Sequence, residues 1–419
     1  MFSSKNISLN TEYFISKKLV TAKDRKSSIS APIIKIAIAA IAIGMIMMII
    51  AVATGLGLQQ KIREKLAAFN GHIIISNFDN NLSEVSLQPI SINQDFYPNF
   101  KNISDISHVQ AVATKAAIIR TASDFEGVIF KGVSKDYNWT FLQDYLVQGK
   151  LPNLKNNTSA EILISSFLAQ RLQLKLNDSF NAFFMKEGNS QLPNLRVFKI
   201  VGIFNSGFPE FDSKYIIGDI RHIQRINKWK PNQIGSFEVF IDDFSKINSK
   251  GDEVYAEIDS TLKSQTITEK FAVIFEWLQL FDFNILVIII VMIAVASINM
   301  VVALLVLILE KTQMIGILKA IGANNWTIRK IFLYNAAHLI SRGLFWGNAI
   351  GITLILIQKY FGIIKLNPEN YYVNQAPIVF DLGIIVLLNA ITIIITLLVL
   401  IIPSIIITKI TPIQAIKHD

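Results

Sequence analysis

Residues 310–335 read EKTQMIGILKAIGANNWTIRKIFLYN and stand between two long apolar runs, at 283–309 and 331–357. A helix needs roughly 20 residues to cross a hydrocarbon core about 30 Å thick, so each run is long enough to span a membrane. Only a short polar stretch separates the two runs. We therefore expect residues 310–330 to form a loop on one face of the membrane.

The periodicity within this loop predicts a short amphipathic helix that ends at Gly322, a residue type suited to helix C-termini. One helical stripe holds Met314, Ile315, Leu318 and Ile321. The opposite stripe holds Thr312, Gly316, Lys319 and Ala323. Four cations against the single acid Glu310 place the loop in the cytoplasm; they are Lys311, Lys319, Arg329 and Lys330. Periodicity alone is also consistent with a helix that only joins two spans.

The amino-acid sequence of the loop resembles that of the FtsX-like ABC permease family, whose signature is E-I-G-I-L-R/K-A-I/L-G-A. Six positions match in register: Gly316, Leu318, Lys319, Ala320, Gly322 and Ala323. In that family the loop carries a coupling helix that sits in a groove of a separate ATPase subunit. The resemblance therefore implies a set of ATPase-coupling residues, which are Glu310, Gln313, Met314, Gly316, Ile317, Leu318, Lys319, Ala320, Gly322 and Ala323.

The composition of the whole chain agrees with a membrane protein. Its 419 residues are 52% hydrophobic with a mean hydropathy of +0.43, which fits several spans together with a sizeable polar domain. The net charge of +9 would suit a nucleic-acid-binding protein. The cations instead follow membrane topology, because residues 1–32, 310–330 and 409–419 are basic whereas the outer loop 358–380 holds only Lys359 and Lys365.

The sequence therefore predicts an α-helical membrane protein with four transmembrane helices and a large α+β extracytoplasmic domain inserted between helices 1 and 2. The predicted segments are a cytoplasmic N-terminal interfacial segment (1–32), transmembrane helix 1 (33–58), the extracytoplasmic domain (59–280), transmembrane helix 2 (281–309), the coupling-helix loop (310–330), transmembrane helix 3 (331–357), the outer loop (358–381), transmembrane helix 4 (382–408) and a cytoplasmic tail (409–419).

Within residues 59–280, short alternating stretches predict strands and short helices. The predicted strands are 72–76, 109–121, 127–133, 161–164, 180–185, 196–204, 215–217 and 237–241. The predicted helices are 166–172, 219–226 and 253–262, and the predicted loops are 79–106 and 186–195. Asn177 is expected to adopt a left-handed turn conformation before Asp178.

Three further patterns resemble the lipoprotein-releasing (Lol) permeases, a branch of the FtsX-like family. The domain motif G-I-F-x-x-G-x-x-E-x-D is matched by Gly202, Ile203, Phe204, Gly207, Glu210 and Asp212. The outer-loop motif is matched by Tyr371, Tyr372, Val373, Pro377 and Val379, and the closing pattern by Pro403, Pro412 and Ala415. The resemblance implies a MacB-like periplasmic core. From composition alone, Glu210 and Asp212 also fit a solvated turn.

Two features of the spans indicate contacts. Gly343, Gly347 and Gly351 form a ridge along span 3 that allows another helix to approach closely, either in a dimer or within one chain. His338 and Arg342 lie one turn apart, and we expect them near the inner headgroups, because a charge at mid-bilayer costs about 2.5–3.5 kcal/mol.

The approach to span 2 is apolar and aromatic. Phe271, Ile274 and Leu278 on this approach form a candidate substrate cleft for acyl chains. A simple aromatic belt at the membrane interface is the alternative.

Catalytic motifs are missing from the sequence. The chain contains no cysteine, no G-x-x-x-x-G-K-[ST] phosphate loop and no H-E-x-x-H motif, and its five histidines are scattered. We therefore expect no enzyme activity, no metal site and no cofactor bound by this chain. ATP and Mg are expected on a partner ATPase subunit.

The resemblance implies the permease subunit of an ABC transporter in a bacterial inner membrane. It would extract lipoproteins by ATP-driven mechanotransmission and deliver them to a periplasmic carrier. Its expected partners are an ABC ATPase, a second identical or paralogous permease subunit and membrane lipid, with no nucleic acid. A MacB-like efflux permease for peptides or drugs, and a division-type FtsX-like module that activates a cell-wall hydrolase, remain alternatives.

Overall fold

The computed structural model describes residues 12, 14–15, 30–80, 83–155, 157–185 and 193–409. The chain divides into two compact units. The helical unit comprises Met1–Leu58, Leu278–Ile364 and Ala376–Asp419, and the sheet domain comprises Gln59–Trp277 and Lys365–Gln375. The interfacial segment expected at residues 1–32 lies mostly outside the described residues, and Pro412 and Ala415 lie outside them as well.

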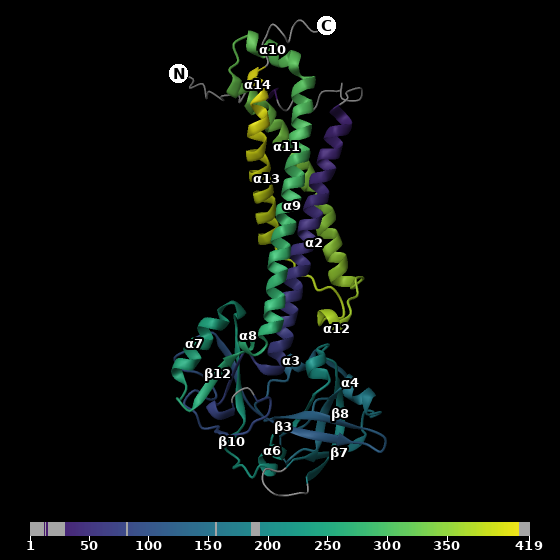
Figure 1. Ribbon diagram of the computed structural model, residues 1–419, viewed down its shortest axis with the longest axis vertical. Coiled ribbons are helices and arrows are strands. Elements are labelled where there is room, and N and C mark those ends of the chain that lie inside the picture. Colours follow the sequence, from purple (N-terminus) through teal and green to yellow (C-terminus); the bar gives the residue numbers. More distant parts are fainter. Residues whose placement is uncertain are drawn as a thin grey trace, which may run out of the picture. The chain divides into compact units, whose positions relative to one another are not determined.

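Four helices in the described part of the chain are long and apolar enough to cross a membrane, which confirms the four predicted spans (Figure 1). They are α2 (Ser30–Asn70), α9 (Ala272–Glu310), α11 (Asn325–Phe361) and α13 (Leu382–Ser404). Three short helices lie between or after them: α10 (Thr312–Ala320), α12 (Pro368–Tyr371) and α14 (Ile406–Lys409). Both α2, with 41 residues, and α9, with 39, are about 60 Å long, twice what the hydrocarbon core requires.

Local signals in the sequence set the ends of the later spans. The side chain of Asn324 accepts a hydrogen bond from the Thr327 amide at 2.7 Å and caps the start of α11. Gly362, with a φ of 56°, ends the same helix in the left-handed conformation. Asp381 caps α13 by accepting from the Gly383 amide at 2.7 Å. These are standard capping arrangements, so the helix bounds follow from local chemistry.

The sheet domain is built on a mixed sheet that has ten strands among the described residues, ordered β12-β1-β11-β3-β4-β9-β6-β8-β5, with β7 paired to β3 and β8 (Figure 1). Its strands are β1 (Ile73–Asn77), β3 (Ile106–Arg120), β4 (Phe125–Val133), β5 (Leu146–Gly149), β6 (Glu161–Ser165), β7 (Ser179–Phe184), β8 (Asn194–Phe204), β9 (Tyr215–Asp219), β11 (Ser236–Ile241) and β12 (Leu262–Thr266). A separate pair joins β2 (Ile90–Ser91) to β10 (Gln233–Ile234).

Short helices connect these strands. They are η2 (Phe78–Asn80), α3 (Thr140–Gln143), α4 (Ser166–Arg171), α5 (Pro209–Asp212), α6 (Arg221–Ile226), η3 (Phe244–Lys246), α7 (Ile247–Glu257) and α8 (Ile267–Lys270). Phe130, Phe184 and Phe198 form the aromatic centre of the core, and the rings of Phe130 and Phe198 are stacked 5.1 Å apart. The α+β architecture predicted from the sequence is therefore confirmed.

All eight predicted strands are present, but the predicted helix at 253–262 is wrong at both ends. The helix α7 runs from Ile247 to Glu257, and Leu262 begins strand β12 instead. Strands β5 and β12 lack regular alternation and are stabilised by main-chain pairing with β8 and β1. The predicted loop 79–106 contains β2, and β8 already begins at Asn194. Asn177 has the expected left-handed conformation, with a φ of 72°.

A buried polar network surrounds the C-terminal end of α2. The Lys131 Nζ donates to the main-chain oxygen of Phe69 and to Glu238 Oε1, both at 2.6 Å. Glu238 Oε2 accepts from Gln110 Nε2 at 2.8 Å, and all three polar side chains are at most 5% exposed. The last carbonyls of a helix have no partner within it, and a cation there is favourable. The ion pair therefore attaches the end of α2 to β3, β4 and β11.

His72, just after α2, has a polar role that depends on its protonation state. Its Nδ1 accepts a hydrogen bond from the Ile241 amide at 3.1 Å, and its ring packs edge-on against Phe240. Burial lowers the pKa of His72 to about 4. The neutral ring is therefore the form that the fold holds, because a protonated Nδ1 could not accept this hydrogen bond.

We expect the folded protein to lose stability through His72 as the pH falls from about 6.5 to 4. The unfolded state binds the proton near pH 6.5, whereas the folded state binds it only near pH 4. The loss amounts to about 3 kcal/mol across this window. The His72→Asn variant keeps an acceptor but does not titrate. Thermal unfolding of the full chain in mild detergent should therefore show a steeper acid-side decline in Tm for the wild type; parallel curves would refute the assignment.

Candidate functional site

The short helix α10 carries most of the predicted coupling residues, and it divides them between two faces. Ile315 and Gly316 are buried, whereas Ile317 is 51% exposed and Ile321 is 75% exposed. Burial therefore does not follow the two stripes: Ile315 of one stripe and Gly316 of the other are buried, whereas Ile321 is exposed. Of the ten coupling residues, the exposed ones are Glu310, Gln313, Ile317, Ala320 and Gly322.

Hydrogen bonds at the ends of two spans explain how α10 is oriented. Thr312 Oγ1 donates to the main-chain oxygen of Leu309 at 2.7 Å, and Lys319 Nζ donates to that of Ile407 at 2.8 Å. Both polar residues therefore lie on the inward side together with Ile315. Ile317 and Ile321 point outward, whereas Met314 and Leu318 are half-buried against the apolar core. A hydrophobicity pattern cannot anticipate the contact of Lys319, because its partner comes from 88 residues further along the chain.

The exposed side of this region is apolar at three positions: Ile317, Ile321 and Trp326, which is 51% exposed. Glu310 pairs with Lys311 at 3.0 Å. An exposed apolar group within a polar loop is typical of a protein contact surface. We call Ile317, Ile321 and Trp326 the α10 face.

The glycine ridge of α11 lies against α2 of the same chain. A Cβ added at Gly343 would come within 2.8 Å of Ile41 Cβ, and one at Gly347 within 2.7 Å of Met45 Cβ. At Gly351 the nearest atom would be Ile49 Cδ1, at 3.1 Å. Of the two alternatives left open by the sequence, the structure shows a contact within one chain. His338 and Arg342 are both exposed on the helical unit.

Residues 365–375 of the outer loop pack within the sheet domain, where two sequence motifs meet. The ring of Tyr372 stacks on Phe208 at 4.5 Å and meets the Trp277 ring edge-on at 5.9 Å. Lys65 Nζ donates to the main-chain oxygen of Tyr372 at 2.8 Å. The outer-loop motif, through Tyr372, therefore contacts the segment that carries the domain motif. Lys65, Phe208 and Trp277 also take part in this contact, and the sequence did not identify them as contact residues.

Asp212 organises the turn that presents Phe208. Its carboxylate accepts from Ser206 Oγ at 2.8 Å, from the Ser206 amide at 3.1 Å and from the Gly207 amide at 3.0 Å. Burial raises the pKa of Asp212, while these hydrogen bonds act in the opposite direction. Gly207 has a φ of 69°, which favours glycine. Asp212 is buried, so a solvated turn is ruled out at that residue.

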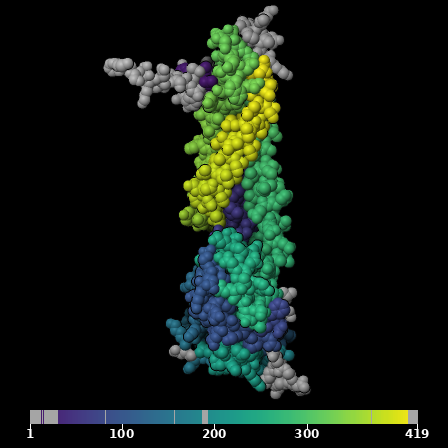
Figure 2. Space-filling model, turned by 90° about the vertical axis from the view of Figure 1, so that its left-hand side faces the viewer, coloured from purple at the N-terminus to yellow at the C-terminus, as the bar shows by residue number. Residues whose placement is uncertain are grey.

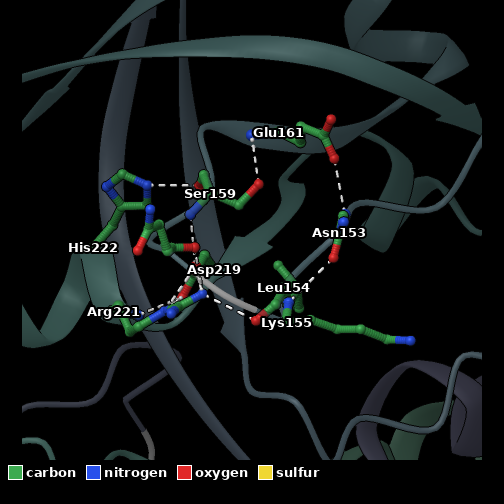
Figure 3. Close-up of polar contacts among 9 residues, drawn as sticks. Asn153, Leu154, Lys155, Ser159, Glu161, Asp219, Arg221 and His222 are labelled. Carbon is green, nitrogen blue, oxygen red and sulfur yellow. Dashed lines mark hydrogen bonds and ion pairs between the residues drawn. The ribbon is translucent and has the colours of Figure 1, made fainter.

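A second polar cluster brings together Ser159, Asp219 and His222, side chains of the types found in hydrolase triads (Figure 3). The His222 Nε2 contacts the main-chain oxygen of Ser159 at 2.8 Å rather than its hydroxyl. Asp219 accepts from the Ser159 amide and is paired with Arg221 at 2.6 Å. Arg221 also donates to the oxygen of Leu154 at 3.0 Å. The cluster therefore anchors the segment before β6, and it lacks the base-to-hydroxyl contact that activates a nucleophile.

The three residues of the candidate substrate cleft differ in accessibility. Phe271 is half-buried against the edge of the Phe211 ring, and Ile274 and Leu278 are buried. The exposed apolar side chains of the same segment are Val273, Leu280 and Phe283, which are 58–80% exposed. Within the described residues no group of three or more His, Cys, Asp or Glu side chains could hold a metal ion.

Two families match this chain. Residues 286–412 match the FtsX-like permease C-terminal family. Residues 36–265, more than half of the chain, match the MacB-like periplasmic core domain. The resemblance drawn from the α10 loop and from the domain motif is thereby confirmed.

Individual relatives extend over almost the whole sequence. The chain is 22% identical to the lipoprotein-releasing system transmembrane protein LolC of Neisseria meningitidis serogroup B, covering 97% of this chain and 99% of that protein. It is 21% identical to LolE of Haemophilus influenzae, covering 88% and 90%. A solved structure of the periplasmic region of MacB from Actinobacillus actinomycetemcomitans is 15% identical to this chain. The match covers 46% of this chain and 87% of the MacB chain, with a TM-score of 0.33.

Replacing Tyr372 with alanine should loosen residues 365–375. Aromatic pairs contribute about 0.5–1.5 kcal/mol beyond their buried area, so amide exchange of this segment should accelerate at least about 2- to 10-fold. Hydrogen exchange with mass spectrometry on the full chain measures this directly. The Tyr372→Phe variant keeps the ring and serves as the matched control. Equal exchange in the wild type and the alanine variant would show that the ring does not hold the loop.

Proposed function

Because the chain belongs to the family of the MacB-like periplasmic core domain and ends in an FtsX-like permease region, we propose that it is the permease subunit of an ABC transporter that releases lipoproteins. The observation that carries the proposal is the likeness to LolC and LolE, which extends over 88–97% of the chain. The membrane would be the inner membrane of a bacterium with two membranes, and the sheet domain would lie in the periplasm.

The α10 face is the proposed contact with the ATPase subunit. Its three exposed apolar side chains lie in a cation-rich loop that the sequence places in the cytoplasm. The chain has no phosphate-binding loop of its own, so ATP and Mg would be held by the partner. A transporter of this kind pairs two permease subunits with two ATPase subunits, and the second permease would be identical or paralogous.

The cargo would be held by its acyl chains at the outer membrane interface and then passed to a periplasmic carrier. An acyl chain that leaves the bilayer loses about 0.8 kcal/mol of burial per CH₂, so it needs another apolar environment, which an apolar surface on α9 would supply. Leu280 and Phe283, both in the helical unit, offer such a surface. Because the cargo begins in the outer leaflet, its release requires no pore through the bilayer. ATP-driven movement of the spans would expel the chains.

Efflux of peptides or drugs is the second candidate, since the MacB-like domain match covers 230 of the 419 residues. A division-type signalling module is disfavoured by the likeness to LolC and LolE and by the outer-loop motif around Tyr372. Efflux and lipoprotein release differ in what reaches α9, and a crosslinking experiment can separate them.

Photo-crosslinking side chains placed at Leu280 and Phe283 should trap lipoproteins before ATP is added and lose them afterwards. The matched controls are Ile274 and Leu278, which lie on the same helix but are buried. Mass spectrometry of the adducts from native membranes identifies the cargo. Adducts with phospholipid alone, with and without ATP, would reject lipoprotein release and favour efflux.

Replacing Ile317 with aspartate should weaken binding of the ATPase subunit about 10- to 100-fold, because a buried isoleucine contributes about 1.5–3 kcal/mol. Co-purification in mild detergent and ATP-dependent release measure the effect. Ile363, which is 67% exposed at the start of the outer loop, provides the matched control as Ile363→Asp. Normal ATPase binding by Ile317→Asp would exclude the α10 face as the contact.

A further inference from the structure

Lys319 makes a contact that its place in the α10 loop does not require. Its Nζ donates to the main-chain oxygen of Ile407 at 2.8 Å and lies 3.4 Å from that of Thr408. Both oxygens belong to α14, the last turn after α13. Carbonyls at a helix C-terminus lack partners within the helix and carry partial negative charge. The lysine therefore caps the end of the fourth span.

A lysine on an interfacial helix ordinarily extends its amine into water or the headgroups. The side chain of Lys319 is instead directed inward, on the same side of α10 as Thr312 and Ile315. Thr312 Oγ1 contacts the last carbonyls of α9, at 2.7 and 3.2 Å. The inward side of α10 therefore contacts the ends of two spans, α9 and α13–α14. Figure 2 shows the yellow end of the fourth span beside the green segment that contains α10.

The fourth span is in turn attached to the third within the apolar bundle. Asn348 and Asn389 exchange two side-chain hydrogen bonds, at 2.7 and 3.0 Å. Such amide pairs are strongly directional where few other partners exist. The third span then packs on α2 through Gly343 and Gly347, whose close approach leaves no room for a side chain. A continuous series of contacts therefore joins α10 to α2 by way of α13 and α11.

We propose that Lys319 is a positioning residue of the transport cycle, which fixes the coupling helix to the cytoplasmic end of the fourth span. A displacement imposed on α10 is then passed to α13, and through α11 to α2. This inference rests on the proposed function, because it takes α10 as the element that the ATPase moves. The competing arrangement is an α10 that moves only as an extension of α9.

Two spin labels test whether α10 and α13 form one body. The chain contains no cysteine, so labels attach only at introduced sites. Gln313 on α10 and Ile402 on α13 are both exposed and suit this purpose. In the full chain in lipid nanodiscs, the wild type should give one narrow distance distribution. Lys319→Met should broaden it, and Lys319→Arg, which still donates, should restore it.

Lys311→Met is the matched control. It removes a cation from the same loop, but the Lys311 side chain pairs with the Glu310 carboxylate rather than with the carbonyls at a helix end. Its distribution should remain narrow. A Lys319→Met distribution as narrow as that of the wild type would overturn the proposal. So would broadening in Lys311→Met as large as that in Lys319→Met, because general loss of charge would then explain the effect.

The second arm uses the transporter complex with its ATPase, with and without ATP and vanadate. The distance between positions 313 and 402 should stay constant in the wild type and shift with nucleotide in Lys319→Met. A wild-type distance that changes with nucleotide overturns the proposal. Failure of the proposed function would give a different result, namely a wild-type complex that releases no lipoprotein. The label distances measured in the chain without the ATPase do not depend on whether lipoprotein is released.

Discussion

The contact between a lysine amine and the last carbonyls of a helix recurs at three points on which this structure depends. Lys131 binds the Phe69 oxygen at the end of α2, Lys319 binds the Ile407 oxygen at the end of the fourth span, and Lys65 binds the Tyr372 oxygen just after α12. Each lysine comes from a distant part of the chain. Because the last carbonyls of a helix lack partners within the helix, the residue that caps them also decides where that end of the helix is anchored.

The cap at the end of α2 has the greatest consequences for the sheet domain. Lys131 and Glu238 are both nearly excluded from water, so neither charge is tolerable without the other. The main effect of this ion pair is to position the end of α2 rather than to stabilise the fold, since it specifies which strands the end of α2 contacts. A helix of 41 residues that is held at its last turn can transmit movement along its axis rather than fray. The proposed mechanical coupling requires a helix whose last turn is held in this way.

Much of the organisation is readable from the sequence because it depends on local chemistry. The four apolar runs predict the spans, and capping residues such as Asn324 and Asp381 set helix bounds without distant help. All eight predicted strands are present, because alternation is strong where one face is buried. Four strands escaped prediction: β2 and β10 have only two residues each, and β5 and β12 have weak alternation and depend on their neighbours. The loop from Glu310 to Ala323 is recognisable from the order of its residues alone.

The sequence by itself determined that the chain is a membrane protein, how many spans it has, that an α+β domain follows the first span, and its family. These features depend on periodicity and sequence motifs, which are properties of residues close together in the chain. Only the tertiary structure decided which way α10 faces, what the glycine ridge touches and what the Tyr372 motif packs against. Each of these depends on a partner that is distant in the sequence: Ile407 for Lys319, Ile41 for Gly343, and Phe208 for Tyr372. A hydrophobic stripe predicts that a face is buried, but it cannot identify the distant carbonyl to which a polar side chain beside that stripe donates.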